Sequence, residues 1–217
     1  MLKKYNNYIK GKWTNSNIFV LLYSLLISYK EKFFKIIFFE IYYSLIYFTK
    51  GKSFKPPHIH PCPYYFIHKI SQFINKKKIS SAVDLGCGFG RLVNFLNDTT
   101  EANISGYEID KEVVKIAKKD KGNNIKIKSG NILDINYNNL RAECYIINEP
   151  FYKSTKENLV KHEMLVKKIE KSKINFKKKY YLIAINVNEK RNYIYKKKKL
   201  IKIISAGHNR TIKIYRG

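Results

Sequence analysis

The stretch from Ala82 to Leu92, AVDLGCGFGRL, constrains the fold more than any other part of the chain. A short apolar run that ends in an acid and then turns through glycines predicts a buried strand, a tight loop and a helix that opens at Arg91. Glycine adopts positive φ readily and has no Cβ, so Gly86, Gly88 and Gly90 would let a ligand approach the backbone. The loop is therefore a candidate ligand site.

The spacing of the glycines and two later segments indicate which kind of ligand the loop would bind. The glycines are spaced Gly-x-Gly-x-Gly, with Arg91 where a dinucleotide-binding fingerprint has its last glycine, which argues against a nicotinamide dinucleotide. Glu108 ends an apolar strand 24 positions after Asp84, where an acid can accept hydrogen bonds from ribose hydroxyls. Asn131 follows a third short strand, in the sequence Gly-Asn-Ile-Leu-Asp.

With its leading acid, the glycine stretch resembles motif I of the class I methyltransferases that depend on S-adenosylmethionine (SAM). In that family the acid and the glycines surround the amino acid end of the cofactor, and the segment containing Asn131 lies beside the adenine. The resemblance implies that SAM is the cofactor and that the following residues bind it: Asp84, Gly86, Cys87, Gly88, Gly90, Glu108, Ile109, Asn131, Ile132 and Asn148.

The segment Asn148-Glu149-Pro150-Phe151 resembles the N-P-P-F or N-P-F motif that ends the fourth strand of many class I methyltransferases. The resemblance implies catalytic roles for Asn148, Pro150 and Phe151: the Asn side chain and a backbone carbonyl accept hydrogen bonds from a target amine, and the aromatic ring stacks on a planar acceptor. Glu149 replaces a proline of the motif. We expect it either to bind a cationic acceptor such as lysine or to face solvent.

The order of elements from residue 80 onward also follows this family. We expect an α/β, Rossmann-like fold with a mostly parallel seven-stranded sheet, an antiparallel last strand and a helical N-terminal extension. The domains are residues 1–60, the extension, and 61–217, the methyltransferase domain. A helix over about residues 64–75 should bury one apolar face, made of Tyr65, Ile67, Ile70, Phe73 and Ile74. A second helix, which ends at about Lys171, should bury Leu159, Val160, Met164, Leu165 and Ile169. The helix between residues 188 and 199 should be short or absent.

Residues 18–48 contain two apolar, aromatic runs separated by Lys30-Glu31-Lys32. Neither run reaches the roughly 20 apolar residues of a bilayer span. We expect two helices packed on the domain, with peripheral membrane contact as the alternative. The proline-rich stretch that ends at Tyr64 looks like a Y-x-P-[ST]-P-like segment of little-characterised bacterial methyltransferases, with Cys62 in place of Ser or Thr. We expect Tyr64 to close the site and contact the substrate, together with Glu149 and Phe151.

The formal charge of +27 comes from 43 Lys and Arg against 16 Asp and Glu, which permits a nucleic-acid partner. Only five of the basic residues are arginines, and such a lysine bias is also what AT-rich coding sequence produces. Three scattered cysteines predict packing rather than disulfides, and a cytoplasmic protein. His58, His60 and His68 lack companions at metal-ligand spacing, so we expect no metal site.

The sequence thus predicts an enzyme that transfers a methyl group from SAM to an amine nitrogen of a protein or small molecule. The exact acceptor is not identified. One alternative is an RNA methyltransferase, which the charge permits. The other is a membrane-peripheral protein that keeps the fold without catalysis, an alternative suggested by residues 18–48 and by Glu149.

Overall fold

The structure, a computed structural model, describes residues 62, 64–119, 126–151, 155–174, 179–187, 189–205 and 211–217. Residues 60–205 and 209–217 form one compact unit, and residues 1–59 with 206–208 are assigned to another. The second unit lies outside the described residues. The expectations for residues 18–48, for the proline-rich stretch and for His58 and His60 therefore stay predictions.

Seven strands form one sheet in the order β3-β2-β1-β4-β5-β7-β6. The five strands from β3 to β5 are parallel, and β7 runs antiparallel to both β5 and β6. This arrangement confirms the expected fold class, including the antiparallel last strand. The strands are β1 (Ser81–Leu85), β2 (Asn103–Glu108), β3 (Ile127–Ser129), β4 (Cys144–Asn148), β5 (Tyr181–Ile185), β6 (Lys199–Ser205) and β7 (Thr211–Arg216).

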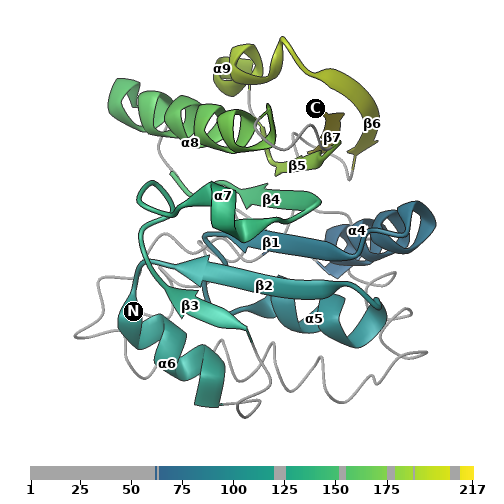
Figure 1. Cartoon of the computed structure of the whole chain (residues 1–217), viewed down its shortest axis with the longest axis vertical. Helices are drawn as coiled ribbons and strands as arrows, with labels where there is room; N and C mark the ends of the chain where they lie inside the picture. The colour runs from purple at the N-terminus through teal and green to yellow at the C-terminus, as the bar shows by residue number, and fades with distance from the viewer. Residues whose placement is uncertain are drawn as a thin grey trace, which may run out of the picture. The chain divides into compact units, whose positions relative to one another are not determined.

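Helices flank the sheet, with α5 and α6 beside β1–β3 and α8 beside β4 and β5 (Figure 1). Between β5 and β6 the described residues form one turn of α-helix and a 3₁₀ turn, so the helix here is short, as expected. The helices are α4 (Tyr64–Lys77), α5 (Arg91–Thr99), α6 (Lys111–Lys119), α7 (Tyr137–Leu140), α8 (Lys156–Ile174), α9 (Glu189–Asn192) and the 3₁₀ helix η2 (Tyr193–Tyr195).

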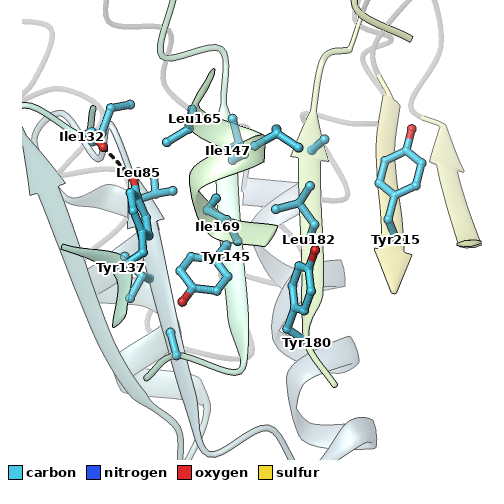
Figure 2. Close-up of a cluster of buried hydrophobic side chains, with 14 of the residues drawn as sticks. Leu85, Ile132, Tyr137, Tyr145, Ile147, Leu165, Ile169, Tyr180, Leu182 and Tyr215 are labelled. Atoms are coloured by element: carbon cyan, nitrogen blue, oxygen red, sulfur yellow. Dashed lines mark hydrogen bonds between the residues drawn. The ribbon is translucent and has the colours of Figure 1, made fainter. Parts of the chain in front are cut away.

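The core between the sheet and helices α7 and α8 is built from aliphatic side chains and tyrosines (Figure 2). Leu85 and Ile147 come from neighbouring strands, and Leu165 and Ile169 from α8. Each of these four side chains is at most 1% exposed. Burying such aliphatic groups contributes roughly 1.5–3 kcal/mol per side chain, so this layer fixes β1 and β4 side by side.

The α8 helix buries a different face from the one that the sequence predicted. Leu165 and Ile169 are buried as expected, but Val160 and Met164 are 49% and 45% exposed, so that part of the prediction is wrong. At 100° per residue, Val160 and Met164 lie roughly opposite the buried positions. The buried side instead includes His162, a polar residue that a search for apolar periodicity passes over.

The other helices agree more closely with expectation. In α4 the residues Ile67, Ile70, Phe73 and Ile74 are buried, joined by Phe66. The Tyr65 side chain lies outside the described part of the structure. The three cysteines are buried thiols, as packing residues are. Within the described ranges, no helix has the length and apolarity needed to cross a bilayer, and no three His, Cys, Asp or Glu residues gather as metal ligands would.

Candidate active site

The predicted site residues lie at the carboxyl ends of adjacent parallel strands. Asp84 lies in β1 and Glu108 ends β2, while Asn148 ends β4. Strand β1 has β2 on one side and β4 on the other, so the chain reverses its winding direction between β1 and β4. In open α/β sheets, ligands bind in the crevice outside the carboxyl ends at such a point. The fold therefore brings both predicted halves of the site to one edge.

The glycine loop is held by backbone hydrogen bonds to β2. The N–H groups of Gly86 and Cys87 both donate to the carbonyl oxygen of Tyr107, at 2.9 Å each. The three loop glycines have φ values of 85°, 53° and 74°, which confirms the expected left-handed turn. Helix α5 begins directly after it, at Arg91, also as expected. Cys87 is buried, and burial is the main reason why the pKa of its thiol lies well above the ordinary value.

Glu108 is a direct partner of this loop. Its Oε2 accepts from the N–H of Gly88 at 2.9 Å, and its Oε1 accepts from the N–H of Asp110 at 3.1 Å. The residue is 8% exposed. Each oxygen of a carboxylate can accept more than one hydrogen bond, so Glu108 holds the loop in shape and keeps acceptor capacity for a ligand hydroxyl.

Asp84 is buried without a full set of partners. The residue is 3% exposed, and its Oδ1 accepts no hydrogen bond within the described part of the protein. Burial, and secondarily the charge of Glu108, raises the pKa of this carboxyl from 3.8 to about 7. A buried carboxylate with an unsatisfied oxygen is costly, which marks Asp84 as a functional-site candidate and favours a cationic ligand group beside it.

Three other residues predicted to bind the cofactor, one after β2 and two after β3, occupy different environments. Asn131 is engaged in its own turn: Oδ1 accepts from the N–H of Leu133 at 3.0 Å, and Nδ2 donates to Asp134 at 3.0 Å. Ile132 is buried in the core, and its carbonyl oxygen accepts the Tyr137 hydroxyl at 2.7 Å (Figure 2). Ile109, after β2, is 66% exposed and offers a bare apolar surface at the strand ends. Cofactor roles for these residues stay predictions.

The loop of residues 148–151, which we name the β4 loop, touches the glycine loop. A Cβ built on Gly86 would lie 3.2 Å from the Cβ of Pro150, which is tighter than ordinary van der Waals contact. Only glycine fits there with φ at 85°. The two halves of the predicted site are therefore in direct contact, whereas the Tyr64 side chain, expected to close the site, lies outside the described residues.

Glu149 and Phe151 contact a residue that the sequence analysis did not single out. Nη1 of Arg191 lies 3.6 Å from Oε1 of Glu149, and Nη2 of Arg191 donates a hydrogen bond to the carbonyl oxygen of Phe151. The Glu149 side chain is 18% exposed and therefore does not simply face solvent. The ring of Phe151 packs edge-on against His162, with 6.2 Å between centroids.

One feature of the sequence could have drawn attention to Arg191: it is one of only five arginines in a strongly lysine-rich chain. An arginine kept in such a composition marks a position that needs a guanidinium. Asn186, directly after β5, was also missed. It has φ of 56°, and its buried Oδ1 has no hydrogen-bond partner among the described residues. No local pattern distinguishes it from an ordinary turn residue.

A pocket with a volume of about 740 Å³ is lined by residues of β2 and β3 and by the segment after β3, which includes Asp134. Three lysines line it, Lys118, Lys126 and Lys128, together with amide and hydroxyl side chains. Its rim includes Asn131, so it adjoins the third-strand part of the predicted site. Lysines with amide and hydroxyl donors are the groups that contact phosphates in nucleic-acid complexes.

Comparisons with known proteins agree with this geometry. Residues 76–210 match the model of a methyltransferase domain family. No curated protein matches the sequence at a significant level. Similar solved structures include an RNA methyltransferase from Salinibacter ruber in complex with S-adenosyl-L-homocysteine, with 15% identity, 72% of this chain and 93% of that one covered, and a TM-score of 0.53.

Two further structures are comparably similar. A putative RNA methyltransferase from Pyrococcus horikoshii is 19% identical, covers 75% of this chain and 88% of its own, and has a TM-score of 0.52. The N-methyltransferase NodS from Bradyrhizobium japonicum is 11% identical, with coverages of 70% and 95% and a TM-score of 0.51. Identities this low show a shared fold. The family match spans more than half of the chain, and the chain therefore belongs to the class I, SAM-dependent methyltransferases.

Proposed function

We propose that this enzyme transfers the methyl group of SAM to an amine nitrogen of a protein or small molecule. The observation that carries the proposal is the contact between the two loops, in which Pro150 of an Asn-Glu-Pro-Phe segment packs against Gly86. An acceptor placed by the β4 loop would then lie next to a cofactor held by the glycine loop. Such proximity is the main requirement of an in-line displacement.

Residues in and directly after β1 and β2, around the glycine loop, fit the parts of SAM. The unsatisfied Oδ1 of Asp84 suits the ammonium group, because a cation beside it would offset the cost of the buried charge. Glu108 suits the ribose hydroxyls, since it is a buried carboxylate already fixed by two backbone donors. Ile109 suits an apolar contact with the adenine ring, being the exposed residue next to Glu108.

When bound, SAM supplies a methyl group on a positively charged sulfur, which a nucleophile can displace without a metal or a strong base. Asn148 would accept a hydrogen bond from the target N–H and so turn the nitrogen lone pair toward the methyl group. Phe151 would pack against the acceptor, and Pro150 would help to exclude water where the two loops meet. A neutral amine then needs only alignment to react.

The test combines binding with product chemistry. Calorimetry with S-adenosylhomocysteine should show one site, after which radiolabelled SAM is incubated with fractions of a cell lysate. We expect label in protein or small-molecule fractions, in a form that resists alkaline hydrolysis as N-methyl groups do. Label found in alkali-labile methyl esters or in nucleic acid would contradict the proposal.

A second candidate, RNA methylation, is favoured by the lysine-lined pocket beside Asn131 and by the +27 charge. Two of the similar structures are named as RNA methyltransferases. In the same labelling experiment this candidate predicts label that ribonuclease removes. Transfer should persist at moderate salt, because non-specific binding through phosphates weakens steeply as salt rises.

A further inference from the structure

Arg191 is buried to an unusual degree for an arginine. Its residue is 1% exposed, and it lies in the single turn of α9, far along the sequence from the β4 loop. Taking a guanidinium out of water is costly unless its donors find charged or carbonyl partners. The partners of its donors therefore indicate the role of Arg191.

Two of those partners belong to the same short loop. One amino group of the guanidinium lies at ion-pair distance, 3.6 Å, from Glu149, and the other donates to the carbonyl oxygen of Phe151. A planar guanidinium presents its donors in a fixed fork, so it can hold two acceptors in a set relation to each other. A lysine has one compact charge and cannot do this equally well.

Glu149 also has a special backbone conformation. Its φ is 44°, in the left-handed region that residues other than glycine seldom adopt. The related motif has proline at this position, and the proline ring locks φ near −65°. Glu149 therefore does not imitate the proline. It gives the loop a different backbone path, and this path brings the carboxylate to Arg191.

The ring of Phe151 has a contact of its own, with helix α8. His162 of α8 packs edge-on against it, and Nε2 of His162 is 2.6 Å from the hydroxyl oxygen of Tyr195. Tyr195 in turn stacks on Tyr215, with 4.8 Å between ring centroids. Burial first, and then the charge of Arg191, lowers the pKa of His162 to about 4, so the imidazole is neutral at physiological pH.

We propose that Arg191 is a positioning residue for methyl transfer: through Glu149 and the Phe151 carbonyl it holds the β4 loop in the conformation that presents Asn148 and Phe151 to the acceptor. The ion pair between Arg191 and Glu149 restricts the β4 loop at the position where the related motif has a proline ring. This inference rests on the proposed function for its effect on turnover, while its effect on the loop stands independently.

The experiment compares the full-length wild type with Arg191→Ala, Arg191→Lys, Glu149→Gln and a control, Lys190→Ala, which removes an exposed cation from the same turn. Hydrogen exchange is followed by mass spectrometry on peptides covering the β4 loop and, separately, β1 with the glycine loop. We expect exchange in the β4 loop to rise about ten-fold in Arg191→Ala, less in Arg191→Lys and Glu149→Gln, and not in Lys190→Ala.

Two further readouts separate positioning from general stability. The dissociation constant of S-adenosylhomocysteine should stay within about three-fold of wild type in every variant, because the contacts of Arg191 with Glu149 and the Phe151 carbonyl are with the β4 loop. The methylation rate of the lysate fraction that the wild type labels should fall about ten-fold or more in Arg191→Ala at saturating SAM, with partial recovery in Arg191→Lys.

The inference is overturned if β4-loop exchange in the Arg191 and Glu149 variants equals that of wild type, or if exchange rises equally in both peptides. It is also overturned if affinity for S-adenosylhomocysteine falls in parallel with turnover. Should Arg191→Ala fail to fold, Arg191→Lys and Glu149→Gln decide the matter on the same readouts. A wild type that labels nothing would count against the proposed function, whereas the exchange result would still decide the role of Arg191.

Discussion

The glycine loop and the β4 loop meet at one edge of the sheet, yet they are held by different means. The glycine loop is fixed from nearby, by N–H groups that donate to Tyr107 and Glu108 of the neighbouring strand. The β4 loop is instead held by side chains of two helices, Arg191 of α9 and His162 of α8. The glycine loop is thus shaped by the strand beside it, whereas the shape of the β4 loop depends on side chains from α8 and α9.

The largest effect should come from Asp84→Asn, which removes the buried carboxylate of β1 just before the glycine loop. We expect affinity for S-adenosylhomocysteine to fall by two orders of magnitude or more, since a buried charge pair to the ligand ammonium is worth about 3–5 kcal/mol when one partner is lost. Calorimetry measures this loss. The control is Asp98→Asn, an exposed carboxylate on α5, which should bind as wild type does.

The same substitution should raise stability while it abolishes binding. The folded-state pKa of Asp84 is raised to about 7 from 3.8, so the carboxyl weakens folding as pH rises from about 4 to about 7, and the cost persists above that range. At pH 8 we expect Asp84→Asn to be about 2 kcal/mol more stable than wild type in urea unfolding, after allowing for the buried amide. A variant less stable at pH 8 would show that Asp84 is not the strained group inferred here.

Gly86→Ala should disturb both loops, because it adds a Cβ at their point of contact. The new atom would lie 3.2 Å from Pro150, on a backbone with φ of 85°. We expect a loss of about 2 kcal/mol in stability and a ten-fold or larger loss of affinity for S-adenosylhomocysteine. The matched variant Gly130→Ala meets no atom closer than 3.8 Å and should change stability by about 0.5 kcal/mol at most. Equal effects at the two glycines would contradict the contact.

The pH dependence of binding should report Asp84 alone. Its carboxyl is largely protonated below its pKa of about 7, and a cationic ligand group needs it ionised. Affinity for S-adenosylhomocysteine should therefore fall as pH drops, by about five-fold between pH 7 and pH 6, with release of a proton on binding. Calorimetry in buffers of different ionisation enthalpy measures that proton, and a pH-independent affinity would rule out the assignment.

Asn131→Ala should have the smallest effect of the set. The substitution removes a side chain that forms hydrogen bonds with Leu133 and Asp134 of its own turn. We expect a stability loss of about 1 kcal/mol and a several-fold loss of affinity for S-adenosylhomocysteine through disorder of the turn. If affinity fell as far as in Asp84→Asn, Asn131 would be a direct ligand of the cofactor.

The two loops also differ in how much of them the sequence predicts. The glycine loop is a local pattern, in which spacing and the acids at Asp84 and Glu108 carry the geometry, and both the turn and the helix start at Arg91 agree with the structure. The order of the strands along the chain agrees as well, because apolar runs between turn residues are also local signals.

The β4 loop could be recognised as a motif, but its support could not. Arg191 is forty positions beyond Phe151, and no local pattern couples them. The buried face of α8 was misjudged for a similar reason: His162 takes an inner position through its contact with Tyr195, while Val160 and Met164 face outward. Long-range polar contacts such as these are set by tertiary packing, which single-sequence periodicity does not contain.

The separation of the two loops is tested most directly by titrating S-adenosylhomocysteine into wild type and Arg191→Ala side by side in one calorimeter series. The account predicts a single site in both proteins, with dissociation constants that agree within about three-fold. Absence of binding to the wild type, or loss of binding in Arg191→Ala with the fold intact, would contradict it.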